Sequence, residues 1–267
     1  MPAARPAARR GPRFTLAAAA TPRLERHRIF ASRDPGETEA FLRRKCFRFD
    51  IDPREAGGLD AEINGVYLPG GPDDYTSYIG CTRYGAPMTL AAEWCRTDYW
   101  VQFVVAGQLR TTNAGEAVTC DIETASISSP TRRDYYVAEA GRDAVVIRLS
   151  VTRTAVLNHL AALLGEEPAS APAFAPRLDL TTGHGRSLRH HVLSAVADLG
   201  DPDSALHLPA AMRALEQLLL TLLLAQPNDA AEPLAAPPRG TPPRHAPPSL
   251  DYIHPNPAAP APRSAIH

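Results

Sequence analysis

The chain has 267 residues, of which 44% are hydrophobic, and its formal net charge is −1. That balance gives no overall attraction to nucleic acid or to anionic lipid, and no apolar run reaches the ~20 residues that a membrane-spanning helix requires. The four cysteines lack Cys-x-x-Cys spacing, which favours buried free thiols in a reducing cytosol over disulfides or a zinc site. We therefore expect a cytoplasmic protein without a membrane anchor.

Both ends of the chain are poor in residues that build a core. The first 28 residues are rich in Arg and Ala, and twelve of the 27 prolines lie in residues 227–267. Neither segment can bury enough apolar surface to offset its chain entropy. We therefore predict disordered segments at residues 1–28 and 227–267, with the folded part between them.

The first predicted element is a short helix that begins near Asp34. Asp34 can cap it, Pro35 suits the first helical position and Glu37 falls at the third. From residue 61 to 151 the pattern changes to short, evenly spaced runs that favour an antiparallel β-barrel or jelly roll. The predicted strands span residues 62–68, 75–84, 88–94, 99–105, 108–112, 117–120, 125–128, 134–138 and 144–151.

Helices follow the strands. Thr152 is placed to cap a helix that Gly165 closes. Two more helices are predicted at about residues 187–199 and 208–226, and the segment Gly200-Asp-Pro-Asp-Ser204 between them favours an antiparallel hairpin. The expected fold class is α+β: a barrel or jelly roll over residues 29–165, followed by a linker and helix pair over residues 166–226.

Six segments occur in a characteristic order along the chain: Ser32-Arg-Asp-Pro-Gly-Glu37, Arg83-Tyr-Gly-Ala-Pro87, Phe174-Ala-Pro-Arg-Leu-Asp-Leu180, Gly183-His-Gly185, Leu218-Leu-Leu-Thr-Leu-Leu-Leu-Ala-Gln-Pro227 and Leu250-Asp-Tyr-Ile-His254. Over residues 28–254 this order resembles the effector-binding half of AraC/XylS-type bacterial transcription regulators. The resemblance implies a cupin-like barrel that binds a small-molecule effector, and dimerisation through the helices that follow the barrel.

In that family, Leu250-Asp-Tyr-Ile-His254 would open the first helix of a DNA-binding domain with two helix-turn-helix units. Here the prolines at 255, 257, 260 and 262 prevent a helix, and 13 residues after His254 cannot encode such a domain. We therefore expect no helix-turn-helix domain and no direct binding of nucleic acid. A frameshift, a disabled copy and a natural partner that does not bind DNA all remain open as explanations.

A small antiparallel barrel could also be a cupin enzyme that holds a metal ion through histidines. Between Ala61 and Val151 the sequence has no histidine, and all nine lie outside that interval. The sequence also lacks a Gly-x-Ser-x-Gly elbow and a phosphate-binding loop. We expect no enzyme activity, metal, cofactor or catalytic residue. The alternatives are a cupin-like enzyme with an unrecognised site, or a protein that inhibits full-length regulators by forming heterodimers with them.

Aromatic residues indicate where an effector would bind. A barrel of about eight strands can hold one small ligand, against apolar walls with a few convergent polar groups. Because alternation shows which residues share a face but not which face is inside, these side chains could instead fill the core. The candidate ligand-binding residues are Trp94, Tyr99, Trp100, Gln102 and Arg148.

The last helix carries a leucine stripe that must be covered. Leu220 and Leu224 widen its apolar arc beyond what one neighbour can cover, which points to a second chain. The expected partner is another copy of the chain or a related regulator. The candidate dimerisation residues are Val192, Val196, Leu199, Met212, Leu215, Leu218, Leu219 and Leu222.

Overall fold

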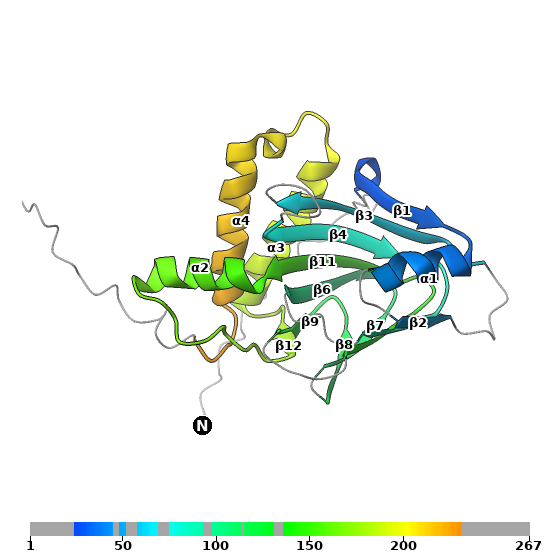
Figure 1. Cartoon of the computed structure of the whole chain (residues 1–267), viewed down its shortest axis with the longest axis horizontal. Helices are drawn as coiled ribbons and strands as arrows, with labels where there is room; N and C mark the ends of the chain where they lie inside the picture. Colours follow the sequence, from blue (N-terminus) through cyan, green and yellow to red (C-terminus); the bar gives the residue numbers. More distant parts are fainter. Residues whose placement is uncertain are drawn as a thin grey trace, which may run out of the picture.

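The computed structural model describes residues 24–44, 48–51, 58–68, 75–92, 98–113, 115–130 and 136–230. In these ranges the chain forms two antiparallel β-sheets with helices packed around them (Figure 1). The strands are β1 (Arg28–Ser32), β2 (Arg48–Ile51), β3 (Ala61–Leu68), β4 (Ser77–Arg83), β5 (Met88–Ala92), β6 (Asp98–Ala106), β7 (Leu109–Asn113), β8 (Glu116–Cys120), β9 (Thr124–Ser128), β10 (Tyr136–Ala140), β11 (Val145–Thr152) and β12 (Arg177–Asp179).

The strands form a seven-stranded sheet, in the order β1-β3-β4-β11-β6-β9-β12, and a five-stranded sheet, in the order β2-β5-β10-β7-β8. The nine strands predicted from the sequence correspond to β3 to β11, with small differences at their ends. The predicted α+β class and antiparallel jelly roll are therefore confirmed. The sequence pattern did not predict β1, β2 and β12, which are short and lie at sheet edges.

Strand β6 separates two hydrophobic cores. Its residues Tyr99, Val101 and Phe103 join the core beneath the helices, whereas Trp100 and Val104 join the core between the two sheets. Successive side chains of a strand point to opposite faces, and β6 is apolar on both because both are covered. We call the face that carries Trp100 the inner face of the seven-stranded sheet, and the face that carries Tyr99 the outer face.

The helices are α1 (Pro35–Arg44), α2 (Arg153–Leu164), α3 (Gly183–Gly200) and α4 (Pro209–Leu224), with 3-10 turns η1 (Glu25–His27) and η2 (Ala205–His207). The predicted caps are confirmed. The Glu37 N–H donates to Asp34 Oδ1 at 2.8 Å, Thr152 accepts from the Ala155 N–H, and α2 ends at Gly165 in the left-handed conformation.

Helix α3 begins earlier than the sequence pattern predicted. Thr182 Oγ1 accepts the Gly185 N–H at 3.0 Å, which makes the Gly-His-Gly segment the first helical turn. A Cβ atom at Gly185 would collide with the Asp179 carbonyl, so glycine allows α3 to start against β12. The described part of the chain also extends past the expected limits of residues 29 and 226, because Leu24 joins the helix-covered core and residue 228 bridges to residue 174.

Helices α2, α3 and α4 cover the outer face, and α1 lies at the far end of the sheets, as Figure 1 shows. Leucines and valines of α3 and α4 share one core with β3, β4, β6 and β11. The helix pair is therefore part of the same packed body as the sheets. No helix in the described ranges is long and apolar enough to cross a membrane.

Candidate functional site

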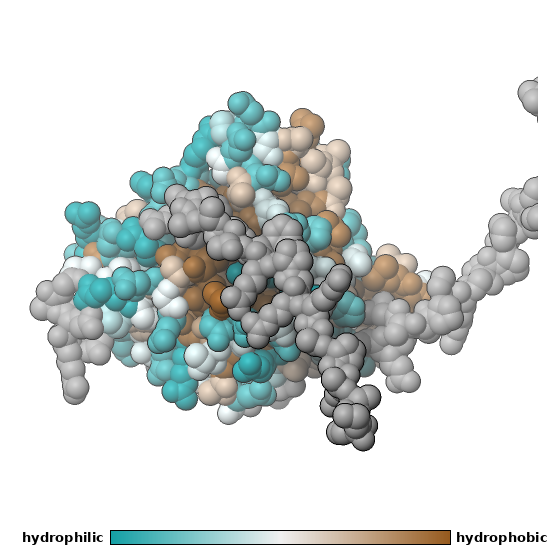
Figure 2. Space-filling view, turned by 180° about the vertical axis from the view of Figure 1, so that it is seen from behind, coloured by the Kyte–Doolittle hydropathy of each residue, from teal (hydrophilic) through white to brown (hydrophobic). Residues whose placement is uncertain are grey.

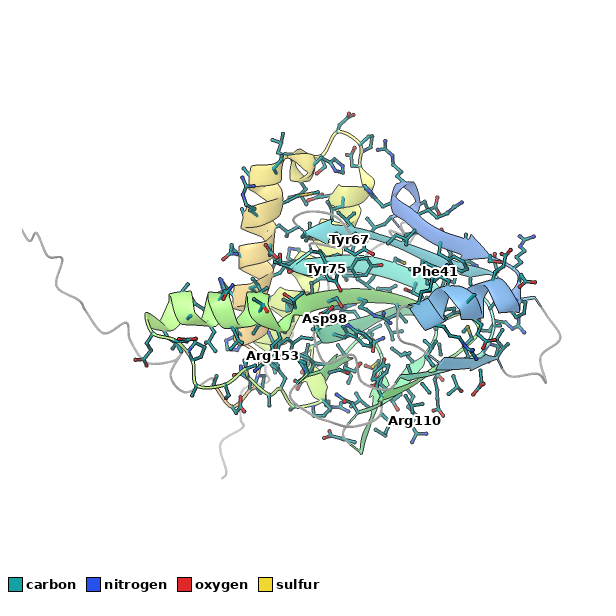
Figure 3. The ribbon with its side chains drawn as sticks, in the orientation of Figure 1. Phe41, Tyr67, Tyr75, Asp98, Arg110 and Arg153 are labelled. Atoms are coloured by element: carbon teal, nitrogen blue, oxygen red, sulfur yellow. The ribbon has the colours of Figure 1, made fainter. Side chains whose placement is uncertain are left out.

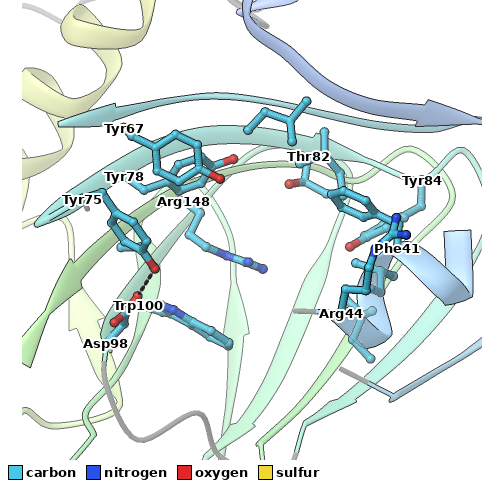
Figure 4. Close-up of a pocket in the computed structure, with 15 residues that line it drawn as sticks. Phe41, Arg44, Tyr67, Tyr75, Tyr78, Thr82, Tyr84, Asp98, Trp100 and Arg148 are labelled. Carbon is cyan, nitrogen blue, oxygen red and sulfur yellow. Dashed lines mark hydrogen bonds between the residues drawn. The ribbon is translucent and has the colours of Figure 1, made fainter. Parts of the chain in front are cut away.

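A cavity of about 280 Å³ opens between the inner face and α1 (Figure 4). Most of its wall comes from alternate residues of β3, β4, β6 and β11, and the rest comes from α1, β1, β5 and the residues that flank β4. It is lined by Ile29, Phe41, Leu42, Arg44, Ile63, Tyr67, Tyr75, Tyr78, Thr82, Tyr84, Leu90, Asp98, Trp100, Arg148 and Ser150.

Two glycines make room for the cavity floor. Gly65 of β3 and Gly80 of β4 are cross-strand partners, and a Cβ atom at either would collide with the ring of Tyr78. The Tyr78 ring therefore lies flat against this glycine pair, and its hydroxyl donates to the Asn64 carbonyl at 3.2 Å. Glycine inside a strand is costly and often marks such a close approach.

Arg148 extends into the middle of the cavity, as Figure 4 shows. It lies on β11 between Gly80 of β4 and Gln102 of β6. Its guanidinium carbon lies 4.9 Å from the centroid of the Trp100 ring, a cation–π geometry. A planar cation is thus held over an aromatic face at the centre of the space.

The phenols around Arg148 are neutral near pH 7. Burial raises the pKa of Tyr78 and Tyr136, and it raises the pKa of Tyr84 to about 12. The positive charge of Arg148 lowers all three pKa values, but burial outweighs it. The cation is therefore surrounded by hydroxyl groups that keep their protons. Two of them donate to acceptors in the protein, Tyr78 to the Asn64 carbonyl and Tyr136 to the Gln102 side chain.

The two ends of the cavity differ in chemistry (Figure 3). At one end the Tyr75 hydroxyl donates to Asp98 Oδ2 at 2.8 Å, and the ring centroids of Tyr67 and Tyr75 lie 5.1 Å apart. At the other end Phe41 of α1 stacks on Phe30 with ring centroids 4.2 Å apart. One end therefore carries a hydrogen-bonded phenol and carboxylate, whereas the other carries stacked aromatic rings beside the exposed Arg44.

A hydrogen-bonded contact links the Tyr75 end of the cavity to α4. Thr76 and Ser77 directly follow Tyr75, and their hydroxyls both donate to Glu216 Oε1, at 2.8 Å for Ser77. Glu216 lies on α4 and is buried. The same short segment thus contacts the cavity and holds the last helix.

The structure brings some of the predicted ligand residues together. Trp100 and Arg148 line the cavity. Gln102 faces the same side but accepts the Tyr136 hydroxyl and is not part of the lining. Tyr99 lies on the outer face, where its hydroxyl donates to the Pro172 carbonyl at 2.8 Å. Trp94 lies outside the described residues.

Sequence reasoning missed most of the lining. Tyr78 and Tyr84 share the inner face with Thr82 by simple alternation along β4 and the turn after it. The signal that could have identified this face is Gly65 together with Gly80, since interior strand glycines suggest that a large side chain lies over them. Tyr67, Tyr75 and Asp98 gave no comparable signal.

The structure places most of the predicted dimerisation residues in the core of the chain itself. Val192, Val196, Leu199, Leu215 and Leu219 are buried against the outer face and neighbouring helices. Leu220 and Leu224 are buried there as well, because α4 packs against α2, α3 and β3 together. Of the predicted residues, Leu218 is exposed, whereas Met212 and Leu222 are half-buried.

In the part of the chain that the structure describes, no three His, Cys, Asp or Glu side chains gather as a metal site would require. Cys81 and Cys120 are buried free thiols, and Cys46 and Cys95 lie outside the described residues. Two sheets around a lined cavity, with helices on one outer face, define a cupin-like fold.

Comparisons with known proteins agree with this class. The family model of the AraC-binding-like domain matches residues 38–224, and the chain belongs to this family. Among solved structures, the AraC-like transcriptional activator CuxR is similar with a TM-score of 0.52 and 15% identity, over 86% of this chain and 78% of that chain. No curated protein sequence gives a significant match.

Two other solved structures match with lower scores. KdgF from Halomonas sp. has a TM-score of 0.28 and 18% identity, over 39% of this chain and 86% of that chain. The Schizosaccharomyces pombe Cnp3 cupin domain has a TM-score of 0.28 and 11% identity, over 46% of this chain and 95% of that chain. The match to CuxR, over 86% of this chain, shows that the chain shares its fold with an AraC-like activator.

Proposed function

We propose that this chain is the sensing module of an AraC-type regulator, which binds a small effector between its sheets and passes the change to its helices. The observation that carries the proposal is the cavity itself, where a centrally placed guanidinium lies among aromatic walls. Apolar walls with a few convergent polar groups are typical of small-molecule sites. The lining, as far as it is described, contains no His or Cys, which favours binding over catalysis.

The segment from Tyr75 to Ser77 supplies a route for the change. A ligand that displaces the Tyr75 ring or its bond to Asp98 also moves the backbone that presents the next two hydroxyls to Glu216. Because Glu216 is buried, its hydrogen bonds are strong relative to those of an exposed carboxylate. Effector binding would thereby shift the position of α4.

The proposed output is dimerisation through the exposed side of α4. Leu218 on this side is 40% exposed, and Leu208 at the start of the helix is 61% exposed. Figure 2 shows apolar atoms gathered over the side of the molecule that carries α4. A symmetric dimer would cover this surface with its own copy, and a related regulator with the same surface could replace one subunit.

The test is an effector screen by thermal shift on the full chain and two variants. Ser150→Leu fills part of the cavity, and Thr119→Leu introduces the same side chain at an exposed position of β8. A true effector should raise the melting temperature of the unaltered protein and of Thr119→Leu, but not that of Ser150→Leu. Compounds that stabilise all three proteins equally bind elsewhere, and a screen with only such compounds would refute the sensing role.

A further inference from the structure

We propose that the effector is a compact monoanion, with a carboxylate or equivalent group bound by Arg148 and an apolar, ring-sized body. This proposal rests on the sensing role above and adds the chemical class of the ligand. Among the residues that the structure describes, three charged side chains line the cavity, and they lie in different places. Asp98 is at one end with Tyr75, Arg44 is at the other end on the exposed side of α1, and Arg148 extends into the centre (Figure 4).

The shape of the central group selects its partner. A guanidinium stacked on an aromatic ring presents its N–H groups in the plane of a rigid fork, and this fork matches the two oxygens of a carboxylate. Arg148 is stacked in this way on Trp100. The protonated phenol of Tyr84, which also lines the cavity, can add a hydrogen bond to the same anion.

The rest of the cavity disfavours a second charge. Phe41, Leu42, Ile63 and Leu90 give the cavity an apolar wall, and an ion buried against these side chains would lose its hydration. The charged residue at this end, Arg44, lies on the exposed side of α1. A cationic ligand would be repelled by Arg148 at the centre. The cavity volume of about 280 Å³ lies just below the ~300 Å³ at which typical ligand pockets begin, which suits a body of one ring.

Three compounds of nearly equal shape separate the charge classes: phenylacetate, phenylacetamide and phenethylamine. Binding is measured by isothermal titration calorimetry at pH 7 with the full chain. Because a hydrogen bond to a charged group discriminates strongly, we expect the acid to bind at least about tenfold tighter than the amide, and the amine to show no binding.

Variants then assign the preference to Arg148. Arg148→Gln should abolish the preference for the acid over the amide, whereas Arg148→Lys should retain part of it. Arg110→Gln is the matched control, because Arg110 is exposed on β7 and does not line the cavity. Its Nη1 atom lies 3.9 Å from Glu139 Oε2. Circular dichroism of each variant confirms that it is folded, and Arg148→Lys keeps the test valid if Arg148→Gln is not.

The outcomes distinguish this proposal from the sensing role. Equal binding of acid and amide, tighter binding of the amine, or an acid preference that survives in Arg148→Gln overturns the anion assignment alone. If none of the three binds, an anionic hit from the effector screen that depends on Arg148 supports the assignment, and neutral or cationic hits overturn it. A screen with no compound that discriminates Ser150→Leu overturns the sensing role and the assignment together.

Discussion

The two faces of the seven-stranded sheet are built from the same strands for opposite purposes. On the outer face, Ile79, Ile147 and Leu149 are fully buried against helices in a hydrophobic core. On the inner face, the adjacent positions Tyr78, Arg148 and Ser150 line a cavity. Alternation therefore lets one strand carry a stabilising surface and a binding surface at once. Substitutions at adjacent residues should separate stability from binding.

The largest effect is expected from truncating the outer face. Leu149→Ala removes a fully buried side chain and should lower the free energy of unfolding by ~2–5 kcal/mol. Ser150→Ala, one residue along β11, removes only a hydroxyl group and should lower the free energy of unfolding by no more than about 1.5 kcal/mol, the upper end for a typical hydrogen bond. Urea denaturation of both variants checks this. Similar losses at the two positions would contradict the division between the faces.

A smaller loss is expected at the junction of the sheet with α4. Glu216→Ala would leave the buried Ser77 hydroxyl without its acceptor, while Thr76 would retain the Leu68 carbonyl, and the change should cost about 1–3 kcal/mol. Glu216→Gln retains an oxygen acceptor and should lose less. Hydrogen exchange of α4 with and without an effector tests the proposed route. An effector response of α4 that is unchanged in Glu216→Ala would show that the signal takes another path.

Gly80→Ala crowds the cavity floor and should lower the free energy of unfolding by about 1–3 kcal/mol, because the added Cβ atom forces the Tyr78 ring to move. It should also weaken effector binding, since the ring moves into the space of the ligand. Gly183→Ala is the control, because a Cβ atom there meets nothing nearby at the start of α3. Thermal melts with and without an effector measure both effects. Unimpaired binding in Gly80→Ala would show that Tyr78 does not shape the site.

The parts of the fold that could be predicted are those that short-range sequence signals specify. Asp34, Thr152 and Gly165 are residues typical of helix caps, and turn residues separate the nine predicted strands. These helix ends and strands could therefore be predicted from the sequence. Strand β12 could not, because only Leu178 of its three residues is buried and its pairing with β9 is set by tertiary packing. The central strands of the jelly roll can therefore be predicted from the sequence, but its short edge strands cannot.

The site was predicted less completely for a different reason. Tyr99 and Trp100 were assigned to one pocket, but neighbours on a strand must face opposite sides, and the structure separates them. For α4, the sequence showed a wide apolar arc. It could not show that three elements of the same chain cover most of that arc, since this depends on the position of the sheet.

The smallest effect on stability is expected on the exposed side of α4, where the proposed dimer would form. Leu218 is 40% exposed and Leu219 is 1% exposed, so the same substitution at adjacent positions has different consequences. Leu218→Asp should change the unfolding free energy of the monomer by less than ~0.5 kcal/mol and convert dimer to monomer, whereas Leu219→Asp buries an unpaired carboxylate and should unfold the helix-covered core. Sedimentation velocity across a range of concentrations, with circular dichroism, measures both. If the dimer survives Leu218→Asp, or if the unaltered protein is monomeric at every concentration, α4 is not the dimer interface. The ligand proposal does not depend on this result, because it rests on the cavity alone.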